Sequence, residues 1–287
     1  MTSSRSTSSQ PTSASLVPSS DPQSKTAPDR ELEAGARAHF EDPLYYSATY
    51  QDRVDDVAFY AAIAERLGGP VLEYGAGNGR ITLPIARKGL AITAVDHVQA
   101  MLDDLKEKVR SEGLGGLVRL RQGDMRRIRL RKRFELVICP FNTALHLYDR
   151  ADLEAFFEGV RRHLAPGGHF VVDLSVPNPR DLARDPARAF HVPRFRHPST
   201  GDLVRNWEHF DYDPVRQILF VSMVFEPVKA PETAWCTPLA HRQYFPQEWE
   251  ALLHYNGFQV DDVFGDFHGG PLDRESEVMV WQTRRRG

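Results

Sequence analysis

The residues best suited to chemistry form a glycine-rich turn that follows a short apolar segment. Residues 71–74 are apolar apart from one acid and a tyrosine, and glycine then occurs at every second position, as Gly75, Gly77 and Gly79. Glycine accepts a positive φ without steric penalty and lets a ligand lie directly against the backbone. A helical pattern follows at once and stops at Gly89. The run therefore predicts the strand, loop and helix that bind a nucleotide in a doubly wound sheet, with a purely structural turn as the alternative.

Polar residues follow the next predicted strands, at the positions where such a sheet binds ligands. Asp96 comes about twenty residues after the glycines, where an acid accepts the two hydroxyls of a ribose. Its alternative role is to cap the helix that follows. Two later loops, 123–125 and 140–147, also come directly after predicted strands. Because open α/β sheets bind ligands at the carboxyl ends of their strands, we expect all of these residues at one site.

Strand and helix patterns alternate through residue 175. The predicted strands are 71–74, 91–95, 117–121, 134–139 and 169–174, and the predicted helices are 30–40, 52–67, 98–109 and 153–164. A short aromatic segment with Tyr45, Tyr46 and Tyr50 separates the first two helices. This order predicts an α/β fold with a doubly wound, mostly parallel sheet.

From residue 176 onward the pattern changes to that of an antiparallel sheet. Alternating segments near 203–211, 217–228 and 234–244 are separated by turn residues at 198–201 and 212–214. A helix near 246–256 and strands near 258–264 and 277–283 follow. We therefore expect a core of residues 30–175 and 246–287, interrupted by an antiparallel insertion of residues 176–245.

Residues 1–29 differ in composition from the rest of the chain. They are mostly Ser, Thr and Pro with few large apolar side chains, so they bury too little surface to offset the entropy of ordering. Their only basic residues are Arg5 and Lys25, and they have no amphipathic face. We expect a disordered tail rather than a transit peptide.

Charge and cysteine content narrow the expected partners. The formal net charge of the 287-residue chain is −3, so no strong field draws it to nucleic acid or to an anionic membrane. Cys139 and Cys236 form no CxxC pair, which argues against a zinc site or a disulfide framework and fits a reducing cytoplasm. No apolar run reaches the ~20 residues of a membrane helix, and the N-terminus lacks a signal-peptide core. We expect a cytoplasmic protein that binds no nucleic acid, membrane or metal.

Four motifs, in order, resemble those of class I S-adenosylmethionine-dependent methyltransferases. They are Glu73-Tyr74-Gly75-Ala76-Gly77-Asn78-Gly79, Asp96, Gly123-Asp124-Met125 and Leu164-Ala165-Pro166-Gly167-Gly168. The third glycine of the turn comes two residues after the second, whereas dinucleotide dehydrogenases place it three residues after. Asn142 and the pair His146-Leu147 further resemble the small-molecule branch that includes glycine N-methyltransferase and the amino-sugar N-methyltransferases.

The resemblance covers about residues 45–282 and implies both a fold and a cofactor site. The fold is a Rossmann-like, seven-stranded sheet with a reversed final hairpin and an antiparallel insertion as a lid over the substrate. For S-adenosyl-L-methionine, Gly75 and Gly77 would contact the methionine part and Asp96 the ribose diol. Asp124 and Met125 would contact the adenine. Arg53 would hold the cofactor carboxylate, with a surface ion pair as its alternative role. The expected cofactor-binding residues are Arg53, Glu73, Gly75, Ala76, Gly77, Asp96, His97, Met101, Gly123, Asp124, Met125 and Pro140.

Methyl transfer requires the nucleophile, the methyl group and the sulfur in line, and an alcohol or ammonium acceptor must also lose a proton. His146 is the expected base, because histidine titrates near neutral pH and the motif match places it beside the site. Its alternative role is a backbone hydrogen bond in the loop. Tyr45, Tyr46 or Tyr50 is expected to close over the methyl group, with aromatic packing as the alternative. Asn142 is expected to orient the substrate or to brace the loop. The substrate contacts expected from the insertion are Trp207, Arg242 and Tyr244.

These patterns predict transfer of a methyl group from S-adenosyl-L-methionine to an oxygen or nitrogen of a small metabolite. The run Cys139-Pro140-Phe141 lacks the polar residue and the Pro-Pro pair found in base and protein-amide methyltransferases. Together with the absence of a basic surface, this argues against nucleic-acid methylation. The alternative functions are an NAD(P)-dependent oxidoreductase and a non-catalytic module that binds the cofactor and regulates a partner. The sequence specifies neither the acceptor nor the oligomeric state.

Overall fold

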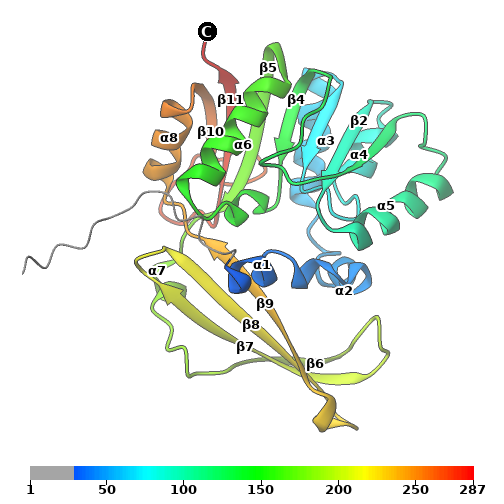
Figure 1. The fold of residues 1–287 in the computed structure, drawn as a ribbon, viewed down its shortest axis with the longest axis vertical. Helices are drawn as coiled ribbons and strands as arrows, with labels where there is room; N and C mark the ends of the chain where they lie inside the picture. The colour runs from blue at the N-terminus through cyan, green and yellow to red at the C-terminus, as the bar shows by residue number, and fades with distance from the viewer. Residues whose placement is uncertain (1–28) are drawn as a thin grey trace, which may run out of the picture.

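Two β-sheets organise the structure, a computed structural model that describes residues 29–287 (Figure 1). The predicted tail lies outside the described residues except for Asp29, whose side chain caps the first helix. The larger sheet has seven strands in the order β10-β11-β5-β4-β1-β2-β3. Their bounds are β1 Val71–Tyr74, β2 Ile92–Asp96, β3 Val118–Gln122, β4 Phe134–Cys139, β5 Leu164–Ser175, β10 Phe258–Phe264 and β11 Val278–Arg285.

β11 runs opposite to the other strands of this sheet, so both of its pairings, with β10 and with β5, are antiparallel. β1 to β5 pair in parallel. The expected seven-stranded, mostly parallel sheet with a reversed final hairpin is confirmed. β5 begins at Leu164, five residues before the predicted start at His169, because Leu164 pairs with Phe134 ahead of a bulge. The Pro-Gly-Gly run is therefore part of the strand and does not precede it.

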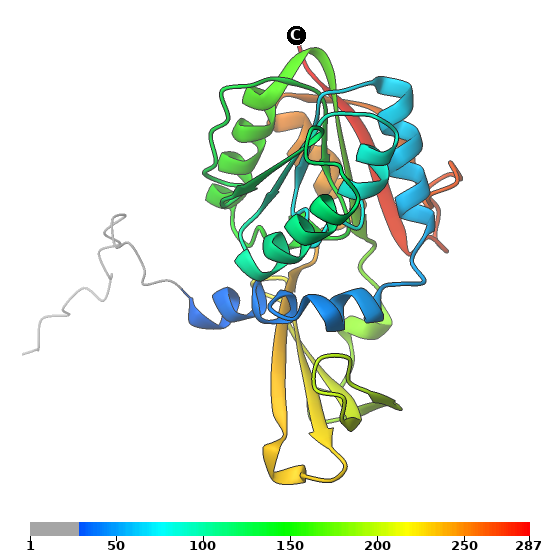
Figure 2. The same ribbon diagram turned by 90° about the vertical axis from the view of Figure 1, so that its right-hand side faces the viewer.

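Helices cover both faces of the seven-stranded sheet (Figures 1 and 2). Strand side chains alternate between the faces, so Val71 packs in a cluster with α3 Asp55–Leu67, α4 Thr82–Arg87 and α5 Gln99–Ser111. Its neighbour Leu72 packs in the other cluster, with α6 Arg150–His163 and α8 Pro246–Tyr255. Both faces are thus buried, as in other doubly wound sheets.

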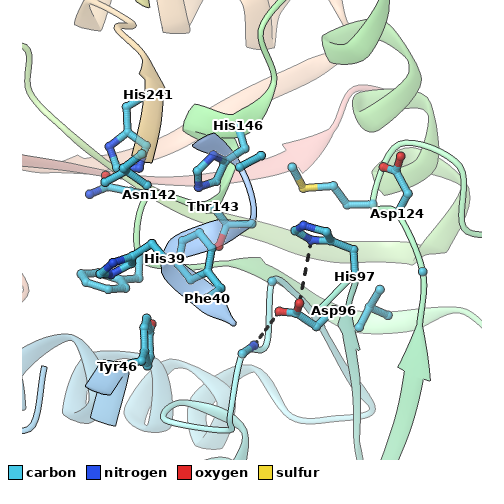
Figure 3. Close-up of a pocket in the computed structure, with 18 of the residues that line it drawn as sticks. His39, Phe40, Tyr46, Asp96, His97, Asp124, Asn142, Thr143, His146 and His241 are labelled. Carbon is cyan, nitrogen blue, oxygen red and sulfur yellow. Dashed lines mark hydrogen bonds and ion pairs between the residues drawn. The ribbon is translucent and has the colours of Figure 1, made fainter. Parts of the chain in front are cut away.

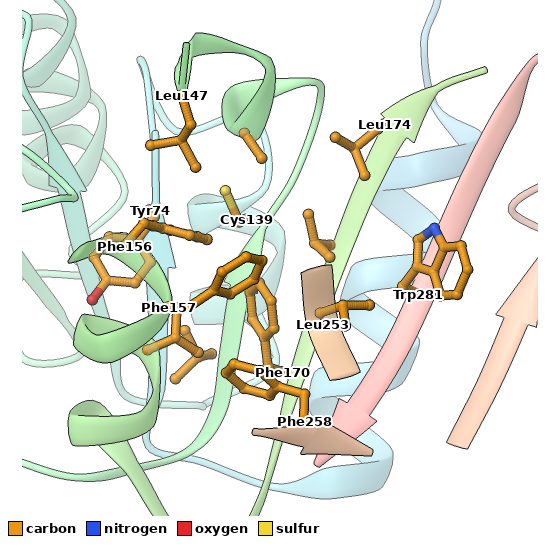
Figure 4. Close-up of a cluster of buried hydrophobic side chains, with 14 of the residues drawn as sticks. Tyr74, Cys139, Leu147, Phe156, Phe157, Phe170, Leu174, Leu253, Phe258 and Trp281 are labelled. Atoms are coloured by element: carbon orange, nitrogen blue, oxygen red, sulfur yellow. The ribbon is translucent and has the colours of Figure 1, made fainter. Parts of the chain in front are cut away.

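Aromatic rings fill the core beneath α6 and α8 (Figure 4). Phe157 lies 5.5 Å from Phe258 between ring centroids, and Phe170 lies 5.6 Å from Phe258 and 6.0 Å from Phe156. Each ring is fully buried and contributes about 1.5–3 kcal/mol relative to exposure. This packing fixes β4 and β5, and the loops that follow their carboxyl ends.

The second sheet is antiparallel and extends away from the core (Figure 2). Its strands are β6 Phe190–Arg196, β7 Leu203–Asp213, β8 Ile218–Pro227 and β9 Trp235–Arg242, in that order. The short helices α7 Pro179–Leu182 and η3 Pro231–Thr233 lie in its connections. Three of the strands follow the predicted segments. β6 was not predicted, because most of its side chains are exposed and show no alternation of apolar and polar residues.

An N-terminal segment made of α1 Arg30–Gly35, η1 Ala38–Phe40 and α2 Pro43–Thr49 lies between the two sheets (Figures 1 and 2). The prediction of one helix over 30–40 is wrong, because α1 ends at Gly35, which lies against β9. A Cβ on Gly35 would come within 2.6 Å of the Ala240 Cβ. The aromatic segment is helical because Asp42 caps it, accepting a hydrogen bond from the Tyr45 N–H at 2.9 Å, and Pro43 opens it.

Within residues 29–287, no helix has the length and apolar character needed to cross a membrane.

Candidate active site

A cavity of about 210 Å³ lies where β1, β2, β3 and β4 end, beneath the N-terminal segment and β9 (Figure 3). Two ends can be distinguished. The acidic end holds Asp96 and Asp124, and the histidine end holds His39, His146 and His241. The predicted site residues that line the cavity are Tyr46, Gly75, Gly77, Asp96, His97, Gly123, Asp124, Met125, Asn142 and His146.

The glycine turn brings the backbone to the cavity wall. Gly75 has φ +67°, and a Cβ there would lie 2.4 Å from the side chain of Thr143 in the loop after β4. Gly77 has φ +53°, and a Cβ there would meet no atom within 4 Å. Gly75 therefore lets two loops pack together, while Gly77 leaves open space over its backbone where a ligand can lie.

Asp96 joins the glycine turn to the start of α5. Its Oδ2 accepts a hydrogen bond from the Gly77 N–H at 2.7 Å, and its Oδ1 accepts one from the Val98 N–H at 2.8 Å. Burial raises the pKa of Asp96 above its usual range, and these two N–H groups oppose the rise. A carboxylate has about four acceptor positions, so two remain for a ligand. The two predicted roles, helix capping and ligand binding, are thus compatible in one side chain.

Asp124 is held by an arginine that the sequence analysis missed. The guanidinium of Arg126 lies 2.7 Å from Asp124 and 2.8 Å from Asp152, and the Arg126 N–H donates to Asp124 Oδ1 at 2.8 Å. Burial opposes ionisation, but these hydrogen bonds hold the pKa of Asp124 below its usual range. Asp124 therefore presents a fixed carboxylate beside Met125 at the acidic end. An arginine two residues after a motif acid was the signal that sequence reasoning could have used.

His146 belongs to η2 Thr143–His146, directly after β4, and lines the histidine end. Its Nδ1 lies 3.2 Å from the Tyr148 hydroxyl, and that hydroxyl donates to the Ala240 carbonyl at 3.0 Å. Because the hydroxyl has a single proton, it accepts from His146, which places the ring proton on Nδ1. Burial, followed by His241 and two further histidines, lowers the pKa of His146 well below its usual value. The ring is neutral at pH 7, and Nε2 is its proton acceptor.

Two further histidines line the same end. His39, on η1, was missed by the sequence analysis, and His241, on β9, had no assigned role. Burial lowers the pKa of each to about 4, so both rings are neutral at pH 7. Nε2 of His39 lies 2.9 Å from the Tyr50 hydroxyl, whereas its Nδ1 is buried without a partner among residues 29–287. In that same range no group of three or more His, Cys, Asp or Glu residues is placed to hold a metal ion.

Aromatic rings form much of the remaining wall. Tyr46 and Tyr50 are four residues apart on and just after α2, so they share one face, and their ring centroids lie 4.9 Å apart. Tyr45 points elsewhere: it stacks on His197 at 5.1 Å in a cluster with the second sheet and does not line the cavity. Burial raises the pKa of Tyr46 to about 12, so its phenol stays protonated. The placement of Tyr45 does not fit its predicted role.

The loop after β4 has an uncommon backbone. Phe141 and Asn142 are consecutive non-glycine residues at φ +54° and +62°. Residues of β5 hold them there: Asp173 accepts from the Phe141 N–H at 2.9 Å, and Ser175 exchanges two hydrogen bonds with the Asn142 side chain, at 2.9 and 2.6 Å. Both polar ends of Asn142 are therefore engaged, which favours loop bracing, its alternative predicted role. The ring of Phe141, another residue that the sequence analysis missed, lines the cavity.

Five of the expected cofactor-binding residues do not line the cavity. Arg53 is exposed and stacks over the Phe141 ring, with its guanidinium carbon 4.7 Å from the centroid. Glu73 is buried beneath the turn, where it accepts from the Thr82 hydroxyl, and burial raises its pKa to about 8. The others support the wall from behind: Ala76, Met101 and Pro140.

The substrate contacts expected from the insertion also lie outside the cavity. Trp207 pairs with Val224, which in turn pairs with Cys236, so these three side chains share one face of the second sheet. Leu239 and His241 line the cavity from the opposite face, because successive side chains of a strand alternate between faces. Arg242 is bound to Glu248 at 2.9 Å. Tyr244 is fully buried in the core, where its hydroxyl donates to the Leu147 carbonyl. The alternation of side chains along β9 was the signal in the sequence that could have identified Leu239 and His241 as cavity residues.

Comparisons with known proteins agree with this geometry. Residues 71–168 match the protein family described as "Methyltransferase domain". The cypemycin N-terminal methyltransferase of a Streptomyces species is 30% identical over 225 residues, which cover 76% of this chain and 84% of that protein. The chain belongs to the class I S-adenosylmethionine-dependent methyltransferases. The expected family is thereby confirmed, and the oxidoreductase alternative finds no support.

Solved structures give the same result for this methyltransferase. The CcbJ methyltransferase from Streptomyces caelestis is 25% identical with a TM-score of 0.71, over 81% of this chain and 90% of that one. The glycopeptide N-methyltransferase MtfA, solved in complex with S-adenosyl-L-methionine, has 23% identity and a TM-score of 0.56, over 80% and 87% of the two chains. The similarity to MtfA is a similarity of fold.

The cofactor of this methyltransferase is S-adenosyl-L-methionine, as predicted. The residues present fit that group. Gly77 leaves the open space that a chain-like ligand needs over the backbone, and Asp96 keeps free acceptor positions for hydroxyl groups. Asp124, fixed by Arg126, forms the wall of the same cavity beyond Asp96.

Proposed function

We propose that this methyltransferase transfers the methyl group of S-adenosyl-L-methionine to a nitrogen of a small-molecule amine, with His146 as the base. The protonation state of His146 carries the proposal. Its Nδ1 is bound to Tyr148, which leaves Nε2 as a proton acceptor on the cavity wall. The same short helix contains Thr143, whose side chain packs on Gly75, so the base lies beside the turn assigned to the cofactor.

When bound, S-adenosyl-L-methionine supplies an electrophilic methyl group on a positively charged sulfur. The chain must hold the acceptor nitrogen in line with that methyl group and keep water out. The nitrogen lone pair forms the new C–N bond, and the electrons of the S–C bond stay on sulfur. The surplus proton on nitrogen passes through Nε2 of His146 to solvent, because the lowered pKa of this ring does not let it keep the proton. We assign Gly75, Gly77 and Asp96 to hold the cofactor through these steps.

Nitrogen is favoured over oxygen as the acceptor by the weakness of the base. Burial keeps the pKa of His146 well below its usual value, and such a ring removes the proton of an aliphatic hydroxyl poorly. A neutral amine attacks with its own lone pair and needs a base only for the proton that it then carries. The relatives named above as an N-terminal and a glycopeptide N-methyltransferase are consistent with this choice.

The histidine end also favours an acceptor group that is uncharged when it reacts. Its lining side chains are neutral imidazoles, aromatic rings, Asn142, Thr143 and Leu239, without a carboxylate, lysine or arginine. A substrate whose reacting nitrogen lies next to a carboxylate would find no cation there to pair with it. We therefore propose a small, largely apolar or aromatic amine, covered by the second sheet as a lid.

Matched amines and alcohols test the proposal. Purified protein with S-adenosyl-L-methionine should form S-adenosylhomocysteine with amines such as 2-phenylethylamine and not with 2-phenylethanol. Calorimetry should show binding of S-adenosyl-L-methionine and none of NADH. Turnover of the alcohol with none of the amine would refute the choice of nitrogen, and binding without turnover of any acceptor would favour the non-catalytic alternative.

A further inference from the structure

His241 lies beside the proposed base and has no bonding partner of its own. Its ring centroid is 5.0 Å from that of His146, with the ring planes inclined at 64°. The two residues come from different parts of the fold, since His146 follows β4 and His241 is on β9 of the second sheet (Figure 3). Both line the cavity, and both are half-buried.

The ring nitrogens of His241 are available to a ligand. Among residues 29–287 they make no hydrogen bond, and they are not sealed from the cavity as Nδ1 of His39 is. His39 differs because its Nε2 is already bound to Tyr50. An imidazole with free nitrogens on the cavity wall can bond to whatever fills the cavity, so it is available to a polar group of the substrate.

The two imidazoles are chemically alike in what they offer. Burial keeps both rings neutral at pH 7, so each has one nitrogen with a proton and one without. For His146 the free acceptor is Nε2, because its Nδ1–H donates to the Tyr148 hydroxyl. An unbound neutral ring of His241 can likewise turn its acceptor nitrogen to the cavity. The pair can therefore receive two hydrogen bonds from one donor group.

We propose that His241 is a positioning residue that, together with His146, holds the two N–H groups of a primary amine and selects it over a secondary amine. A neutral primary amine has two N–H bonds and one lone pair. With one N–H donated to each imidazole, the lone pair has a single remaining direction, and in-line transfer requires that direction to be toward the methyl group. This inference rests on the proposed N-methylation.

The proposal determines how many methyl groups are added. A singly methylated product has only one N–H, so its binding leaves one imidazole of the pair without a donor. A site whose polar groups lose a partner discriminates strongly against the ligand that lacks it. We expect the secondary amine to bind roughly tenfold or more weakly than the primary amine, and the enzyme to stop after one methyl transfer.

Two amines that differ by one methyl group test this assignment. 2-Phenylethylamine and N-methyl-2-phenylethylamine are titrated into the complex of the full chain with S-adenosylhomocysteine, at one pH above the pKa of both amines so that both bind in the neutral form. Wild-type protein should prefer the primary amine by about tenfold or more. His241→Phe fills the same space without nitrogens and should bring the ratio of the two dissociation constants close to one. His241→Gln returns a hydrogen-bond acceptor and should restore part of the preference.

His191→Phe is the matched control, because His191 is an exposed histidine on β6 of the same sheet. It should keep the wild-type ratio, and all variants should bind S-adenosylhomocysteine within about twofold of wild type. Equal affinities of the two amines for wild type, or a preference that persists in His241→Phe, would overturn the two-imidazole site and leave N-methylation by His146 intact. Absence of S-adenosylhomocysteine formation with every amine would instead overturn the proposed function, and the inference with it.

Discussion

Asp96→Asn separates the two roles of the residue that joins the glycine turn to α5. In the native protein one carboxylate oxygen accepts from the Gly77 N–H at 2.7 Å and the other from the Val98 N–H at 2.8 Å. Asparagine keeps the shape but replaces one oxygen with an NH₂ group. Whichever way the amide turns, one backbone N–H then faces a donor, and fewer acceptor positions remain for the ribose.

The size of the effect follows from these contacts. A hydrogen bond to a charged group contributes about 1.5–3 kcal/mol, and Asp96 is only 8% exposed, so water does not replace the lost acceptor. The free energy of unfolding should fall by about 1–3 kcal/mol through the unpaired N–H. If Asp96 binds the ribose as proposed, the affinity for S-adenosyl-L-methionine should fall about 10- to 100-fold.

Calorimetry with S-adenosyl-L-methionine and urea denaturation without it measure the two losses separately. Glu107→Gln is the control, since Glu107 forms an exposed ion pair with Arg110 on α5 and should change either quantity by less than about 0.5 kcal/mol. A normal dissociation constant together with reduced stability would mean that Asp96 only braces the turn. Normal values for both would refute the hydrogen-bond argument itself.

Three further variants test other parts of the structure. His146→Ala should lower kcat by about 10² to 10⁴ with cofactor affinity nearly constant. Because burial lowers the pKa of His146, the kcat of the wild-type protein should not change as the pH falls through 6.5. A loss of kcat near pH 6.5 would contradict the buried setting of this ring. Gly75→Ala should weaken cofactor binding at least tenfold and lower the melting temperature, because its Cβ meets Thr143 at φ +67°, and unchanged values for both would show that the loops yield. His163 is buried with a pKa of about 4, so at pH 5 the unfolded chain binds a proton there that the folded protein does not. The stability advantage of wild type over His163→Gln should shrink by up to about 1.4 kcal/mol per pH unit between about pH 6.5 and 4, and a constant difference in urea denaturation would refute this.

The acidic end of the cavity could be predicted from the sequence because it depends on local rules. Gly75, Gly77, Asp96 and Asp124 each follow a parallel strand, and parallel strands place their carboxyl ends along one edge. The position of the cavity follows from this rule, whereas the expected family rested on four motifs in order. The spacing of the third glycine helped to distinguish this turn from that of a dehydrogenase.

The histidine end could not be predicted in the same way, because its residues converge from segments far apart in the sequence. His39 lies before the first strand and His241 on β9, and nothing local links either to His146. Tyr45 and Trp207 lie outside the cavity for a different reason. Each is one residue away from a side chain on the cavity side of its element, Tyr46 on α2 and Glu208 on β7, so the segment was identified but its inward face was not.

The strained pair Phe141 and Asn142 has a consequence for how the active protein forms. Two adjacent side-chain-bearing residues at positive φ are unfavourable in an unfolded chain, so the loop after β4 has little tendency to take this shape alone. Its restraints, Asp173 and Ser175, are at the end of β5, a strand that α6 separates from β4 in the sequence. The loop can therefore be held in this shape only once β5 has paired with β4, and recovery of activity during refolding should lag behind the appearance of helix signal.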